Sequence, residues 1–62
     1  MLILQSEAQY LLDSDALLME SELNYIRLVA EGMELTNLMA SLGKNKHEIE
    51  RLDLSIQQEF DI

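Results

Sequence analysis

The chain has 62 residues and no cysteine, and its 12 acidic and 4 basic side chains leave a formal net charge of -8 at pH 7. This length allows one small domain, and the lack of cysteine excludes disulfides and thiolate metal sites. A strongly acidic chain repels phosphate backbones and anionic lipids, so nucleic acid is an unlikely partner and a membrane is not expected.

The residue content favours an all-α protein. Hydrophobic residues make up 48% of the chain, there is no proline, and there are only two glycines. The longest apolar run, residues 1–4, is far shorter than the ~20 residues that cross a bilayer. No basic stretch precedes an apolar one, so we expect no signal peptide and a cytoplasmic location.

Residues from about 4 to 42 show helical periodicity and predict one long first helix with two apolar stripes. The first stripe consists of Leu4, Ala8, Leu11, Leu12, Met19, Leu23, Ile26, Ala30 and Met33. The second stripe, roughly opposite, consists of Ile3, Tyr10, Leu17, Leu28, Leu35, Met39 and Leu42. A helix with a single neighbour needs only one stripe, so the second stripe predicts an interface with another chain. The two methionines of the first stripe, Met19 and Met33, are expected in the core.

Two places could interrupt this long helix. Asp13-Ser14-Asp15 could end a short helix and cap a new one. The apolar residues on either side of it stay in phase, which favours a continuous helix. Gly32 could end or kink the helix, because glycine costs ~1 kcal/mol there relative to alanine. The apolar residues also change side after Gly32, so one helix that changes partner and two helices with a kink both remain open.

Leu42 and the residues after it predict a turn and a second helix. Gly43 follows the last periodic residue, where a left-handed glycine commonly ends a helix. Asn45 and Glu48 have the spacing of a capping box. The second helix, from about residue 46 to 60, has one narrow stripe, which consists of Ile49, Leu52, Ile56 and Phe60. The expected fold is therefore a helical hairpin that dimerises into a bundle of coiled-coil type.

No group of residues predicts catalysis, a cofactor or a metal site. His47 is the only histidine, and it lacks the further ligands that a zinc site requires. Asp13 and Asp15 begin like a calcium loop, but Leu17 and Leu18 stand where an oxygen ligand and a glycine are required. No serine has a histidine at helical spacing that could act as its base. We therefore expect a protein that is not an enzyme.

The first functional interpretation is a small acidic module that binds another protein, of the adaptor, antagonist or co-chaperone type. It would act as a homodimer or higher oligomer, because a chain of this size is only marginally stable alone. Its acidic surface would suit a basic patch on an unknown protein partner. The predicted interface is the whole second stripe.

An alternative comes from residues 36–52, which resemble a helix-turn-helix motif. Gly43 would be the turn glycine, Met39 would stand at the position of the small residue before it, and Ile49 would be the apolar residue after it. The basic residues near the would-be recognition helix are Lys44, Lys46 and Arg51. Two features depart from the motif. Met39 stands where alanine is usual, and the helix also carries Glu48, Glu50, Asp53 and Glu59.

These departures place a DNA-binding transcriptional regulator second, behind the protein-binding module. A third possibility is an acidic mimic of nucleic acid that blocks a DNA-binding protein.

Overall fold

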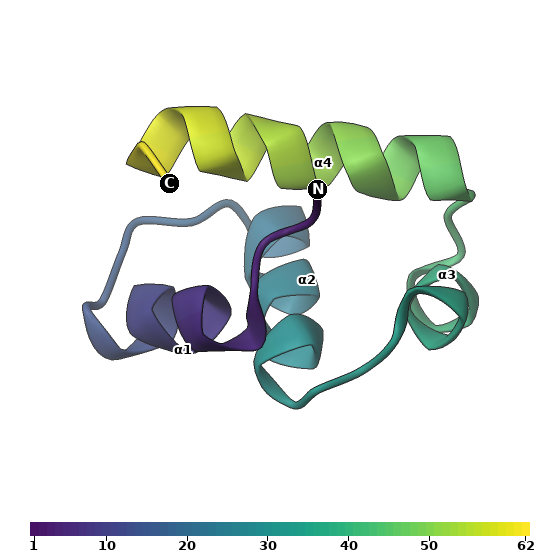
Figure 1. The fold of residues 1–62 in the computed structure, drawn as a ribbon, viewed down its shortest axis with the longest axis horizontal. Helices are drawn as coiled ribbons and strands as arrows, with labels where there is room; N and C mark the ends of the chain where they lie inside the picture. The colour runs from purple at the N-terminus through teal and green to yellow at the C-terminus, as the bar shows by residue number, and fades with distance from the viewer.

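A computed structural model describes all 62 residues and shows four helices and no strand (Figure 1). The helices are α1 (Gln5–Asp13), α2 (Glu20–Ala30), α3 (Leu35–Leu42) and α4 (Lys46–Phe60). The all-α class is confirmed, and so are the bounds expected for the last helix. The long first helix, and with it the two-helix hairpin, is wrong: residues 4–42 form three helices. No helix has the length and apolar character needed to cross a membrane.

The first interruption lies at Asp13-Ser14-Asp15. The Ser14 N–H still bonds to the Tyr10 carbonyl at 2.9 Å, but Asp15 has a φ of 59° and turns the chain out of the helix. Aspartate tolerates this left-handed conformation better than most residues. Apolar residues on both sides stay in phase only by coincidence of spacing, because residues 16–19 are not helical.

The second interruption is a Schellman motif at Gly32. Gly32 has a φ of 89°, its N–H bonds to the Val29 carbonyl at 2.9 Å, and the Met33 N–H bonds to the Leu28 carbonyl at 3.1 Å. These bonds satisfy carbonyls at the end of α2 and stop the helix. The change of apolar side after Gly32 therefore marks a new helix.

Both glycines hold positive φ, so alanine at either position should be destabilising. At Gly43 (φ 65°) an added Cβ meets nothing within 4 Å, and Gly43→Ala should cost about 1 kcal/mol from backbone strain alone. Gly32→Ala should cost at least as much, because a φ of 89° lies further from the left-handed minimum. Urea denaturation of both variants measures these costs. A neutral Gly32→Ala would favour the continuous helix instead.

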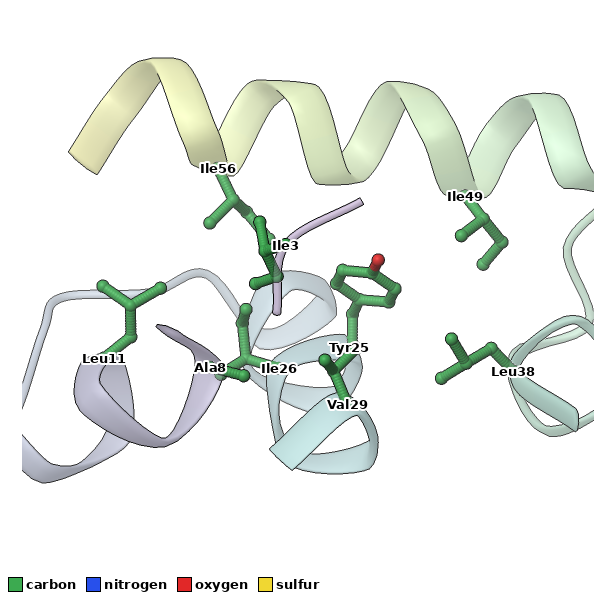
Figure 2. Close-up of a cluster of buried hydrophobic side chains, with 9 residues drawn as sticks. All are labelled: Ile3, Ala8, Leu11, Tyr25, Ile26, Val29, Leu38, Ile49 and Ile56. Carbon is green, nitrogen blue, oxygen red and sulfur yellow. The ribbon is translucent and has the colours of Figure 1, made fainter. Parts of the chain in front are cut away.

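The core lies between α2 and the surrounding elements (Figure 2). Its nine buried residues are Ile3, Ala8, Leu11, Tyr25, Ile26, Val29, Leu38, Ile49 and Ile56. They come from the N-terminal segment and from all four helices, so no helix is buried alone. Met33 packs against this core, but Met19 is 72% exposed, and its expected core position is wrong. The reason is again the segment 16–19, whose extended course turns Met19 outward.

Candidate nucleic-acid interface

A short turn connects α3 to α4. Three residues, 43–45, join the two helices. Gly43 takes the left-handed conformation, and the Lys44 N–H bonds back to the Met39 carbonyl at 3.1 Å. In Figure 1, α3 is seen end-on where α4 runs across the page, so the two helices cross steeply. Helix-turn-helix motifs also join two crossed helices by a short turn that often contains glycine.

Asn45 fixes where α4 begins. Its side chain accepts a hydrogen bond from the Glu48 N–H at 2.9 Å, and the Glu48 carboxylate accepts one from the Asn45 N–H at 3.0 Å. The predicted capping box is therefore confirmed. It holds the first turn of α4 and the lysines beside it in a defined place, since both backbone donors are satisfied.

One face of α4 is exposed to solvent. His47, Arg51, Leu54 and Gln58 are spaced by four, three and four residues, which places them on one side of a helix. All four are exposed. The opposite side carries the buried residues Ile49, Asp53 and Ile56. An α-helix with one free face is the element that fits the major groove of DNA.

The basic residues of the chain are concentrated at this turn and helix. Residues 44–51 contain three of the four Lys and Arg side chains, Lys44, Lys46 and Arg51, against two carboxylates. Lys46 and Arg51 are exposed, and Lys44 is half-buried. The other 54 residues hold ten carboxylates and only Arg27, so their net charge is -9. Residues 44–51 therefore carry a net charge of +1, in contrast to the strongly acidic remainder of the chain.

The four acidic residues of α4 differ in their positions. The carboxylate of Asp53 is fully buried, and that of Glu48 is occupied by the capping box. Glu59 lies in the last turn, far along the helix from the lysines. Glu48 and Glu50 both lie exposed among the basic residues. Two of the four carboxylates therefore lie beside the basic residues, and the other two, of Asp53 and Glu59, lie away from them.

Asp53 joins α4 to the rest of the fold. Its carboxylate accepts hydrogen bonds from the Ile3 N–H at 3.0 Å and from the Tyr25 hydroxyl at 2.5 Å, and also from Gln57 Nε2. Gln57 Nε2 also donates to the Met1 carbonyl at 2.8 Å. Figure 2 shows the Tyr25 hydroxyl pointing from α2 towards α4. A buried carboxylate with several donors is satisfied, so this cluster fixes the orientation of α4.

Burial raises the pKa of the Tyr25 phenol above its ordinary value of 10.0, and the hydrogen bond to Asp53 and the charge of Asp53 raise it further. Because folding raises this pKa, the contribution of the Tyr25 phenol to the free energy of unfolding is complete below pH 10 and is lost as the pH rises above it.

The free energy of unfolding should therefore fall above pH 10, by at most about 1.4 kcal/mol per pH unit from this group. Tyr25→Phe should lower stability at pH 8 and reduce this alkaline loss. Denaturation series from pH 8 to 11 measure both effects. The matched control is Tyr10→Phe, at a tyrosine that is 66% exposed, and it should keep the profile of the parent. An unchanged alkaline loss in Tyr25→Phe would contradict the assignment.

The residues of the second stripe do not lie on one helix. Ile3 is buried in the core, and Tyr10 and Leu17 are exposed, at 66% and 91%. The remaining members, half-buried against the core, are Leu28, Leu35, Met39 and Leu42. Their role as a dimer interface stays a prediction.

Asp53 and Tyr25 were not singled out from the sequence. A signal was present: Asp53 stands four residues after Ile49 and three before Ile56, in the middle of the apolar stripe. A charged residue at such a position is rarely buried unless it has partners. Its partners, Ile3 and Tyr25, are 50 and 28 residues away, and only the tertiary fold brings them together.

The structure contains one pocket and no cluster of metal-ligand side chains. A pocket of about 330 Å³ lies between the N-terminal segment and α4, but its buried acid, Asp53, is already bonded within the fold. Nowhere do three His, Cys, Asp or Glu side chains come together as metal ligands. Comparisons with models of protein families, with curated proteins and with solved structures found no match to this chain.

Proposed function

We propose that the chain binds duplex DNA, with α3 and α4 as a helix-turn-helix and α4 as the helix that enters the major groove. The observation that carries the proposal is the concentration of three of the four Lys and Arg residues in the turn and the first half of α4. The exposed face of α4 supplies side chains for base contacts. In this motif the recognition helix is the second one, and its N-terminal residues contact the bases.

The charge distribution also sets the strength of binding. Three cations allow about three phosphate contacts, far fewer than the 6–10 of many DNA-binding proteins. The acidic remainder of the chain lowers the attraction at longer range. Weak binding by one copy and tighter binding by two copies at paired half-sites are therefore expected, which agrees with the predicted homodimer.

The test is the salt dependence of binding to a fluorescently labelled duplex of mixed sequence. The logarithm of affinity against the logarithm of salt concentration should have a slope of about -3 per protein, because each phosphate contact contributes about -0.9. Lys46→Gln should reduce the slope by about 1. Arg27→Gln, which removes a charge from α2, is the control and should leave it unchanged. No binding at low salt, or an equal effect of both variants, would contradict the proposal.

Protein binding is a second candidate, which retains the acidic-module interpretation. The observation that favours it is the exposure of large apolar side chains outside α4. The exposed large apolar residues outside α4 are Met1, Leu4, Tyr10, Leu17, Met19 and Ile62. Single exposed apolar residues are ordinary on a soluble protein, but adjacent ones mark contact sites. Sedimentation with and without DNA would separate self-association from DNA-driven assembly.

A further inference from the structure

An exposed apolar strip lies in the segment 16–19, which connects α1 to α2. Leu17 is 91% and Met19 72% exposed, whereas Ala16 and Leu18 pack against the core. This alternation is typical of an extended segment, whose successive side chains point to opposite sides. Leu17 and Met19 therefore project together away from the core, and we use the name connector strip for residues 16–19.

The main chain of the connector strip is only partly bonded within the molecule. The Ala16 N–H bonds to the Leu11 carbonyl at 3.3 Å, and the Met19 N–H bonds to the Glu22 carboxylate at 3.0 Å. The N–H groups of Leu17 and Leu18 have no backbone or side-chain acceptor in the chain. An extended segment with free donors can pair with a second extended segment, as in β-strand addition.

The surroundings of the connector strip carry charge of one sign. Residues 1–26 contain five carboxylates and no Lys, Arg or His. Three of these carboxylates, Asp13, Asp15 and Glu20, are exposed and flank the strip along the chain. In Figure 1 this connection lies at the opposite end of the molecule from the turn between α3 and α4. A partner at this end must offer apolar side chains together with positive charge.

We propose that the connector strip binds a short extended segment of another protein in which apolar side chains alternate with Lys or Arg. A second copy of this chain is a poor occupant. Two acidic ends would repel each other, whereas a segment with Lys or Arg is attracted. This inference goes beyond DNA binding and rests on the second candidate function, protein binding.

The test is a titration of ¹⁵N-labelled protein, followed by amide chemical shifts, with two peptides of equal charge. One peptide is acetyl-Lys-Leu-Lys-Leu-Lys-amide, and the other has serine in place of both leucines. The leucine peptide should cause saturable shifts in residues 15–20 and bind at least about tenfold more tightly than the serine peptide, because burial of the leucines stabilises the complex. Leu17→Gln should remove most of this difference. Its matched control is Leu54→Gln, on the exposed face of α4, which should bind like the parent.

Each other outcome has a definite meaning. Equal binding of both peptides would show attraction by charge alone and overturn the proposal. Leucine-dependent shifts elsewhere would overturn this surface but retain protein binding as a function, whereas no leucine-dependent shifts anywhere would count against both. Concentration-dependent shifts of residues 15–20 without peptide, abolished by Leu17→Gln, would assign the strip to a second copy and overturn the proposed partner.

Discussion

Asp53→Ala should unfold most of the protein at room temperature. The substitution leaves the Ile3 N–H and the Tyr25 hydroxyl without their acceptor in a buried place, and the half-buried Gln57 amide loses one of its two acceptors. Each unsatisfied buried donor costs about 1–3 kcal/mol, so the two buried donors cost about 2–6 kcal/mol, and the loss of the Gln57 bond adds to this. A domain of this size has a stability of only about 3–9 kcal/mol at 0.05–0.15 kcal/mol per residue. Circular dichroism with urea denaturation measures the loss.

A neighbouring acid on the same helix supplies the control. Glu50 is exposed, so Glu50→Ala should change stability by no more than about 0.5 kcal/mol. Tyr25→Phe removes one of the donors together with its hydroxyl and should cost about 1.5–3 kcal/mol, because the lost hydrogen bond is to a charged group. An Asp53→Ala variant as stable as the parent would show that the cluster does not hold α4 in place.

Arg51→Glu should weaken binding to duplex DNA by about 10–100-fold, because it removes an attractive charge from the exposed face of α4 and adds a repulsive one near the phosphates. Arg51 is exposed, so the helix content should stay that of the parent. Fluorescence anisotropy at a fixed low salt concentration measures the change in affinity, and circular dichroism checks the fold.

Arg27→Glu is the matched control for this reversal. It changes the net charge by the same amount, but Arg27 lies in the last turn of α2, outside the helix-turn-helix. If residues 44–51 bind DNA, Arg27→Glu should reduce the affinity only slightly. If both variants lose the same affinity, the effect comes from overall charge, and α4 has no special role.

The end of the chain could be predicted because its signals are local. Gly43, Asn45 and Glu48 lie within six residues of one another and specify the end of α3 and the start of α4 through backbone conformation and capping bonds. The stripe of α4 likewise needs only helical spacing. The helix-turn-helix resemblance, drawn from residues 36–52, depends on the same local signals, and DNA binding stays a proposal.

The first half of the chain could not be predicted in the same way. The apolar residues around Asp13 and Asp15 keep a helical phase, although the chain leaves the helix at Asp15. Gly32 was compatible with both a kink and a helix end, and only the Schellman bonds decide between them. The sequence does not distinguish Asp53 from the other acidic residues of α4, because the burial of Asp53 depends on Ile3 and Tyr25 from distant parts of the sequence.

The most direct measurement is a map of amide chemical shifts in ¹⁵N-labelled protein during titration with duplex DNA at low salt. Binding through the helix-turn-helix predicts saturable shifts in residues 43–54, with those of α1 and of the connector strip unchanged. Shifts confined to α1 or the connector strip, or no shifts up to millimolar duplex, would contradict DNA binding through α4.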